Sequence, residues 1–333
     1  MIFFKSCVYS TGSALSLALV FGSTLAGPIM KRYGRKLQTI VSLGIHSIAW
    51  GIIAVSQDFI TLCAGMVING LALGGCDAFT CLYMGECSHP KYRGQFMSSM
   101  FVLVIGSTVV LYALALVLNW RGLAIFISIA PLIRLPVLCK IPESPIWLLG
   151  QRRIEEARQA MQWLYGDHYD IEHELQECVK HQQETKEAMA TWKDALTWQY
   201  LKPVAIVAVL TLLRQFSGGT ALLMYLSQVL KRVDLGFDTK YASLVIACGQ
   251  LVFILVSGKL FDVVGRKKTV LMSGMHMCMS EAAMGAYFYI DKHPEYSNIL
   301  KGQVNIFQLI LMNISTFDIF FAGMNGFLCC SLA

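Results

Sequence analysis

Long apolar runs recur along almost the whole chain, and they constrain its fold more than any other feature. A helix that crosses the hydrocarbon core of a bilayer needs roughly 20 mostly apolar residues, because only its own backbone can satisfy the N–H and C=O groups there. Breaking the runs at charge clusters and at Gly or Pro gives nine predicted spans: 6–26, 37–55, 60–84, 95–118, 120–139, 203–229, 241–261, 269–290 and 303–331. The sequence therefore predicts an all-α membrane protein.

Charged and reactive residues are sparse for a chain of this size. Of the 333 residues, 56% are hydrophobic and 14% are charged, whereas soluble proteins carry about 25% charged residues. The eleven cysteines contain no C-x-x-C pair, so neither a disulfide framework nor a zinc site is predicted. No phosphate-binding loop, H-E-x-x-H helix or nucleophile elbow is found. We expect a protein embedded in the lipid bilayer, with no enzymatic activity, cofactor, metal or nucleic-acid partner.

One extended polar segment, 143–200, separates five predicted spans from four. It contains two helix-like patterns whose apolar residues each share one face: Ile154, Ala157, Met161 and Leu164 in the first, and Ile171, Leu175, Cys178 and Val179 in the second. The sequence thus predicts an N-terminal bundle over 1–142, an amphipathic-helical linker over 143–200 and a C-terminal bundle over 201–333.

Lys and Arg collect in alternate loops, and this asymmetry predicts the orientation in the membrane. The basic set comprises loops 27–36, 86–94 and 258–268 together with the linker 143–200, all of which we expect in the cytoplasm. With nine spans, this orientation places the N-terminus outside the cell. We therefore expect at least one further span in front of the first.

Two short basic segments repeat one pattern in matching places of the two halves: GPIMKRYGRK at 27–36 and GKLFDVVGRK at 258–267. We expect Gly27 and Gly258 to let neighbouring helices approach, and Gly34 and Gly265 to make tight turns. A single G-R-K turn is common in cytoplasmic loops, but a matched pair indicates an internal duplication.

These segments resemble the repeated turn of the major facilitator superfamily, and within it the sugar porters, which read roughly G-x-x-x-D-R-x-G-R-R/K. The second copy keeps the acidic residue as Asp262, whereas Lys31 stands in its place in the first copy. Glu86 and Arg93 match the family's E-x6-R-G element. The segment beginning Pro142, Glu143, Ser144, Pro145 matches its P-E-S-P-R-W-L element, with Ile146 replacing the arginine.

The segment RQFSGGTALLMY resembles the family's seventh-helix motif Q-Q-L-S-G-x-N-x-x-x-Y-Y. The resemblance implies a sugar site to which Gln215, Ser217, Thr220 and Tyr225 contribute neutral hydrogen-bonding groups. Gly218 would loosen the helix there, so that backbone groups reach the cavity. Thr220 and Tyr225 also suit ordinary helix packing, and this second interpretation stays open.

In this family two bundles rock about a central site, so the resemblance implies charged residues that latch the cytoplasmic side when the cavity faces outward. The expected members are Arg35, Glu86, Arg93, Glu143, Asp262 and Arg266. The alternative is that these charges only anchor loops on the cytoplasmic side.

The resemblance implies a carrier of a mono- or disaccharide such as glucose or trehalose, in the plasma membrane. The chain resembles insect facilitated trehalose and hexose carriers through residue 290, and its spans correspond to the family's second through tenth helices. We expect the first, eleventh and twelfth helices to be missing, so a truncated membrane protein that does not transport, or that serves a regulatory or sensing role, is one alternative. An organic-ion carrier of the same superfamily is another. Uniport and proton symport both stay open.

Overall fold

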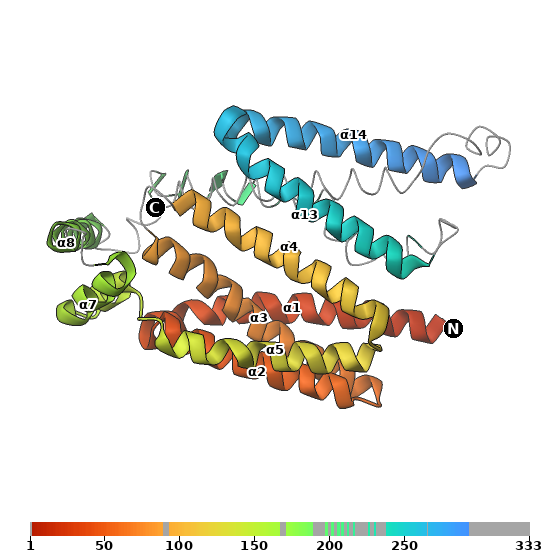
Figure 1. Cartoon of the computed structure of the whole chain (residues 1–333), viewed down its shortest axis with the longest axis horizontal. Coiled ribbons are helices and arrows are strands. Elements are labelled where there is room, and N and C mark those ends of the chain that lie inside the picture. Colours follow the sequence, from red (N-terminus) through yellow and green to blue (C-terminus); the bar gives the residue numbers. More distant parts are fainter. Residues whose placement is uncertain are drawn as a thin grey trace. The chain divides into compact units, whose positions relative to one another are not determined.

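The computed structural model of the chain is built from helices, and it describes residues 2–88, 93–166, 171–188, 238–264 and 266–292, with isolated positions between 197 and 230 (Figure 1). The described helices are α1 (Ile2–Tyr33), α2 (Arg35–Val55), α3 (Phe59–Cys87), α4 (Arg93–Val117), α5 (Trp120–Lys140), α6 (Pro145–Gly150), α7 (Ile154–Tyr165), α8 (Ile171–Ala188), α13 (Thr239–Val264) and α14 (Arg266–Lys292). No strand occurs within these ranges.

Seven of the nine predicted spans coincide with described helices, namely α1 to α5, α13 and α14. The other two, 203–229 and 303–331, lie largely or wholly outside the described residues. Four helical segments in the described part are long and apolar enough to cross a bilayer: Gly12–Tyr33, Arg35–Val55, Phe59–Cys76 and Trp120–Lys140. The chain is therefore an all-α membrane protein, as the sequence predicts.

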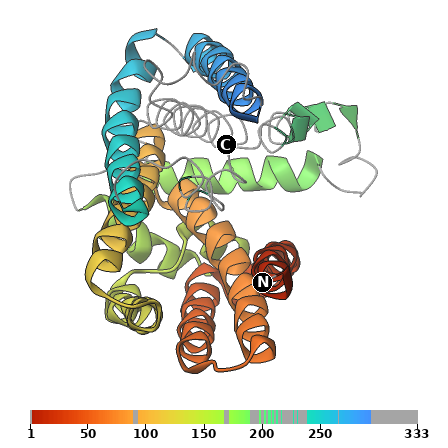
Figure 2. The same cartoon turned by 90° about the vertical axis from the view of Figure 1, so that its right-hand side faces the viewer.

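The first compact unit comprises Met1–Pro90 and Leu118–Tyr200, and its long helices run side by side (Figures 1 and 2). Helix α3 packs against both α1 and α2, and α2 packs against α5. Glycines allow α1 and α3 to meet closely: a Cβ at Gly22 would lie 2.3 Å from the Leu71 carbonyl oxygen, and one at Gly70 would lie 2.5 Å from that of Leu15. Such small residues let backbones approach where lipid supplies no hydrophobic driving force.

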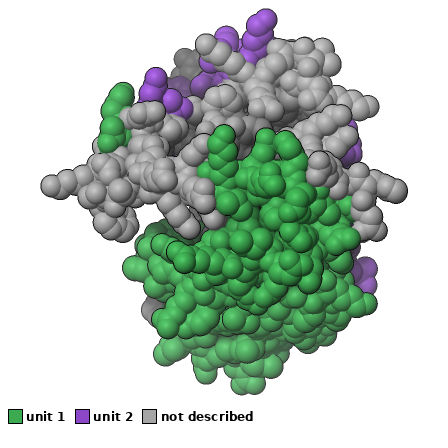
Figure 3. Space-filling model, turned by 90° about the vertical axis from the view of Figure 1, so that its left-hand side faces the viewer, with its two compact units in different colours: residues 1–90, 118–200 green, residues 91–117, 201–333 purple. Residues whose placement is uncertain are grey.

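The second compact unit comprises Lys91–Val117 and Leu201–Ala333 (Figure 3). Within it α4 packs against α13 through Ile105 and Ile254, and α13 contacts α14. These units differ from the predicted boundaries, since residues 91–117 group with the second unit and the linker 143–200 groups with the first. The division into an N-terminal bundle (1–142), a linker (143–200) and a C-terminal bundle (201–333) stays a prediction.

The linker folds into three described helices rather than two, because α6 precedes the two predicted ones. Its core consists of Leu148, Leu149, Ala157, Ala160, Met161 and Leu175, with Ile171, Cys178 and Val179 packed against it. The predicted apolar faces are therefore confirmed over most of their length. Two of the predicted residues lie outside this core: Ile154, in the first turn of α7, is exposed, and Leu164 is only partly buried.

The basic segment 27–36 is mostly helical, which corrects the expectation of a turn spanning it. Helix α1 continues through Pro28 to Tyr33, α2 begins at Arg35, and the turn shrinks to Gly34. Lys31 and Arg32 occupy the last turn of α1, where cations interact favourably with the negative end of the helix dipole. In the second copy α13 runs to Val264 and α14 begins at Arg266, while residue 265 lies outside the described residues.

Candidate functional site

The turn between α1 and α2 depends on a glycine that no other residue could replace without strain. Gly34 has φ 96° and ψ 168°, a region that is essentially restricted to glycine. A Cβ at this position would lie 2.5 Å from Glu143 Oε2 and 3.4 Å from the Trp147 ring. The glycine therefore serves two purposes: it permits the backbone reversal, and it leaves room for a carboxylate from a distant segment. The predicted turn at Gly34 is confirmed.

That carboxylate caps the N-terminus of α2. Glu143 accepts hydrogen bonds from the backbone N–H groups of Arg35 at 2.9 Å and Lys36 at 3.0 Å, and from that of Ser144 at 3.0 Å. The first N–H groups of a helix have no partner within the helix, and the positive end of the helix dipole attracts an anion. Glu143 satisfies both requirements from 108 residues away in the sequence.

Arg35 and Glu86 form a nearly buried, two-bond ion pair. Arg35 Nη2 donates to Glu86 Oε1 at 2.7 Å and its Nε donates to Oε2 at 3.1 Å, while its Nη1 donates to the Met30 carbonyl at 3.2 Å. The two side chains are only 14% and 11% exposed. A buried pair is stable only when further hydrogen bonds satisfy its remaining polar atoms. Here those bonds come from Met30 at the end of α1 and from the linker.

Ser144 connects this ion pair to the linker. Its hydroxyl donates a short hydrogen bond to Glu86 Oε2. The same hydroxyl accepts a hydrogen bond from the backbone N–H of Trp147 at 3.3 Å, which makes Ser144 the N-cap of α6. Pro145 follows as the first residue of the helix, a position that suits its fixed φ angle. Arg35, Glu86, Glu143 and the fully buried Ser144, called here the turn cluster, thus join α2, α3 and the start of the linker.

The linker also holds the last turn of α1 and the end of α3. The Trp147 ring nitrogen and the Gln151 amide both donate to the Lys31 carbonyl, at 3.1 and 3.3 Å. The Tyr83 hydroxyl donates to the Pro142 carbonyl at 2.9 Å. These contacts satisfy a carbonyl that the end of α1 leaves free within its own helix. They position α6 against two transmembrane helices at once.

Cys87 lies beside the turn cluster, and burial affects the ionisation of its thiol. Burial raises the pKa of the Cys87 thiol to about 12, and the Tyr83 hydroxyl opposes this through a hydrogen bond. The thiol therefore stays protonated at neutral pH, and a protonated thiol is neither a good nucleophile nor a metal ligand.

The structure brings together part of the predicted charge network. Arg35, Glu86 and Glu143 meet, with Gly34, Pro142 and Pro145 beside them, whereas their role as a gate stays a prediction. The described side chains do not include those of Arg93, Asp262 and Arg266, and Gln215, Ser217, Gly218, Thr220, Tyr225 and Gly265 lie outside the described residues altogether.

Two further glycines were predicted to let helices approach. For Gly27 this stays a prediction without support, since no described residue lies within 4 Å of a Cβ built there, whereas close contacts occur at Gly22, Gly70 and Gly74. Gly258 lies within α13, where the structure describes the backbone but not the surrounding contacts, so its role stays a prediction. A repeated motif can thus locate a turn without locating the helix contact beside it.

Sequence reasoning missed the connecting roles of Ser144 and Trp147. A serine directly before a proline and a short apolar run is a helix N-cap signal, so the position of Ser144 could have been found. The hydrogen bond from Trp147 to Lys31 has no local signal, because it joins residues 116 positions apart.

The chain is similar to a known protein family and to several of its members. The family model for the sugar (and other) transporter matches residues 6–330. The facilitated trehalose transporter Tret1 of Apis mellifera ligustica is 29% identical over 287 residues, which cover 84% of this chain and 56% of that protein. The mouse solute carrier family 2, facilitated glucose transporter member 8, is 28% identical over 283 residues, covering 84% and 57%.

Among solved structures, the proton:xylose symporter XylE bound to 6-bromo-6-deoxy-D-glucose superposes with a TM-score of 0.81 at 17% identity, covering 98% of this chain and 72% of that one. This likeness shows a shared major-facilitator fold. The chain spans somewhat more than half the length of these two relatives and about a third of the Tret1 proteins of Anopheles gambiae and Aedes aegypti. Because the family model covers nearly every residue, the chain belongs to the sugar (and other) transporter family.

Proposed function

We propose that this protein moves a neutral sugar, such as glucose or trehalose, across the plasma membrane by alternating access. Membership of the family and similarity to relatives named for trehalose and glucose transport support this proposal. The observation that carries it is the turn cluster, which lies at the ends of α2 and α3 that the basic segments 27–36, 86–94 and 143–200 predict to be cytoplasmic.

The turn cluster suits one side of a latch because it fixes the ends of α2 and α3 and the start of the linker within the first unit. An isolated exposed ion pair is worth only about 0 to 1 kcal/mol. Moving a two-state population from 1:99 to 99:1 takes about 5.5 kcal/mol. The cluster combines a two-bond ion pair, a helix cap and a serine bridge, all shielded from water, and its summed strength is our proposed contribution to the energy that a latch requires. Arg93, Asp262 and Arg266 are its proposed remaining members.

For the sugar site we propose Gln215, Ser217, Thr220 and Tyr225, with Gly218 giving backbone access to the cavity. A sugar hydroxyl both donates and accepts hydrogen bonds, and amide and hydroxyl side chains match that chemistry without a full charge.

Uptake of radiolabelled trehalose and glucose into proteoliposomes tests the proposal, with a full-length relative measured in parallel. We expect uptake that saturates with sugar concentration and that Gln215→Ala impairs without lowering the amount of protein in the membrane. If the relative transports and this chain takes up neither sugar, the carrier proposal fails for this chain. Unchanged kinetics in Gln215→Ala would remove that residue from the site.

The same vesicles distinguish uniport from symport. An inward proton gradient should accelerate uptake and drive accumulation if protons are cotransported, whereas a uniporter only equilibrates the sugar. A labelled organic anion in the same assay tests the organic-ion alternative, since a neutral-sugar carrier should not take it up.

A further inference from the structure

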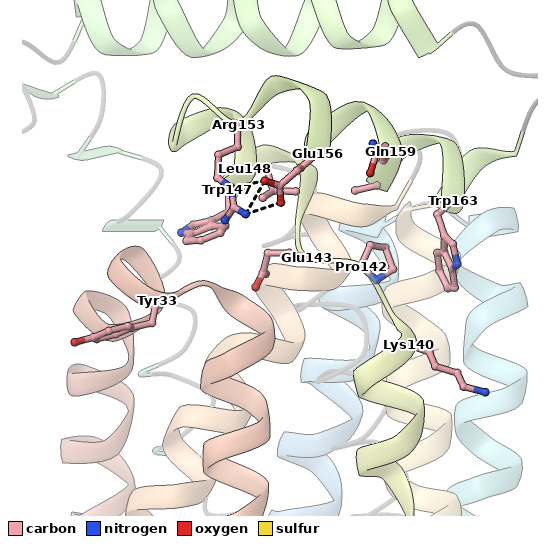
Figure 4. Close-up of a pocket in the computed structure, with 11 residues that line it drawn as sticks. Tyr33, Lys140, Pro142, Glu143, Trp147, Leu148, Arg153, Glu156, Gln159 and Trp163 are labelled. Carbon is pink, nitrogen blue, oxygen red and sulfur yellow. Dashed lines mark hydrogen bonds and ion pairs between the residues drawn. The ribbon is translucent and has the colours of Figure 1, made fainter.

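A pocket of about 430 Å³ lies where the end of α5 meets the linker (Figure 4). Its lining comes from the ends of α1 and α5, from the chain entering α6, and from α6 and α7, and it includes Tyr33, Lys140, Glu143, Trp147, Glu156 and Trp163. All of these belong to the first compact unit. The predicted sugar site, by contrast, is drawn from residues 215–225, so this pocket is a separate feature.

The charges that line the pocket are compensated with one exception. Glu143 accepts three backbone N–H groups, and Glu156 is paired with Arg153 through two hydrogen bonds of 2.6 and 2.7 Å, which Figure 4 draws. Lys140 has no ion-pair partner among the described residues. Lys140 lies at the membrane-facing edge of the pocket, and Figure 4 shows its ammonium extending away from Glu143 and Trp147. This edge therefore offers one positive charge without an ion-pair partner, and its complement is an anion that approaches from the side of the span.

Exposed apolar residues on α5 lead toward Lys140, and the exposed Arg134 lies on the same helix between them. Ile133, Val137 and Lys140 share one helix face by their spacing of four and three residues, and the two apolar side chains are 71% and 60% exposed. Only 11% of the α5 span is buried inside the structure. In a bilayer Ile133 and Val137 face acyl chains, so the anion that reaches Lys140 along them is attached to a lipid.

Aromatic and basic residues around the pocket fit the same ligand. Trp163 is 60% exposed beside the end of the span, and tryptophan favours the level of lipid headgroups. Lys31, Arg32 and Arg152, which neighbour the lining residues Tyr33 and Arg153 in sequence, are also exposed. Basic residues just outside a span attract anionic headgroups.

We propose that this pocket is a binding site for an anionic phospholipid of the adjacent leaflet. Its phosphate contacts the Lys140 ammonium, its headgroup enters beside Trp163, and an acyl chain follows Ile133 and Val137. Glu143, whose carboxylate would repel a phosphate, lines the same pocket but is engaged with the backbone at the start of α2. Binding requires neither sugar nor transport, so the site stands or falls independently of the proposed function.

Native mass spectrometry of the full chain in detergent, titrated with phosphatidylserine or phosphatidylcholine, tests the site. We expect preferential retention of phosphatidylserine, and a loss of about fivefold in its affinity in Lys140→Gln, the effect of one basic residue at a membrane surface. Lys140→Arg should retain the affinity. Lys180→Gln removes the same charge from the exposed surface of α8, outside the pocket, and should leave affinity unchanged.

Three results would overturn the proposal. Equal retention of the two lipids would remove the anionic preference, and equal losses in the Lys140 and Lys180 variants would mean diffuse attraction. Competition by soluble glycerophosphoserine at the concentration of the lipid would indicate a site for free anions.

If Lys140→Gln does not fold, photolabelling of the unmodified chain with a phosphatidylserine analogue that carries a photoreactive headgroup tests the site instead. Labelling of the peptides that carry Lys140 or Trp163 supports the site, and labelling confined to other peptides refutes it.

Discussion

Two arginine–glutamate pairs in the first unit have nearly the same length but very different surroundings. Arg35 and Glu86 approach to 2.7 Å with side chains 14% and 11% exposed, whereas Arg153 and Glu156 approach to 2.6 Å with side chains 51% and 50% exposed. The first pair joins α2 to α3 through residues that are 51 positions apart in sequence. The second pair joins residues three positions apart at the start of α7. Distance alone therefore says little about what an ion pair contributes.

What differs is the number of other groups that depend on each pair. Glu86 also accepts the Ser144 hydroxyl, and Arg35 also donates to Met30 while its backbone N–H is held by Glu143. Removing one member of the buried pair leaves the other charge without compensation in a place that water hardly reaches. When one member of the exposed pair is removed, water solvates the remaining charge, so the loss of stability is small.

The largest effect is expected for Glu86→Gln. The substitution keeps the shape of the side chain but leaves Arg35 as an uncompensated, nearly buried charge, and breaking such pairs costs about 3 to 5 kcal/mol. The free energy of unfolding in mixed detergent micelles measures the loss. In a double-mutant cycle with Arg35→Gln, the double variant should lose less than the sum of the two single variants. Additive losses would show that the two residues act separately.

A somewhat smaller effect is expected for Gly34→Ala. Strain in a glycine-only backbone region costs about 1 to 3 kcal/mol, and the new Cβ would also displace the Glu143 carboxylate from the end of α2. Gly27→Ala is the matched control, because that glycine lies in a helix, no described residue lies within 4 Å of a Cβ built there, and alanine favours helix by about 0.5 to 1 kcal/mol. If both variants lose equal stability, the turn geometry is not what matters.

The sequence predicts the members of the turn cluster better than their contacts. Arg35, Glu86 and Glu143 stand out because each belongs to a short motif, and Gly34 because glycine before two basic residues marks a turn. Their mutual arrangement depends on packing between segments that are 51 and 108 residues apart, which no local pattern encodes. The same limit explains Gly27, whose place in the motif gives no information about what packs beside it.

Helix ends near the membrane surface were predicted less well, for a physical reason. Basic residues mark cytoplasmic loops, but they also stabilise the last turn of a helix, so the pattern of Lys31 and Arg32 fits a loop and a helix end equally. Ile154 shows the related case in the linker, since an apolar residue in the first turn of a helix need not face the core that the rest of the helix covers.

Ser144→Ala should have an intermediate effect of roughly 1 to 2 kcal/mol. The substitution removes the N-cap of α6, which alone is worth about 1 kcal/mol, and it takes one hydrogen bond from Glu86. Ser107→Ala is the control, because among the described residues the Ser107 hydroxyl donates to the carbonyl of Val104 in its own helix. A loss in Ser144→Ala no greater than in this control would mean that the serine bridge contributes nothing to the cluster.

The smallest effect is expected for Glu156→Gln, which tests the exposed member of the comparison. An exposed pair contributes about 0 to 1 kcal/mol, and salt should weaken it further because the Debye length falls to about 3 Å at 1 M ionic strength. Unfolding measured at low and high salt should show a small loss that vanishes at high salt, whereas the loss in Glu86→Gln should persist, because its pair is shielded from solvent ions. If both losses respond to salt equally, the turn cluster is open to solvent, and the summed strength that a latch requires would not be available from it.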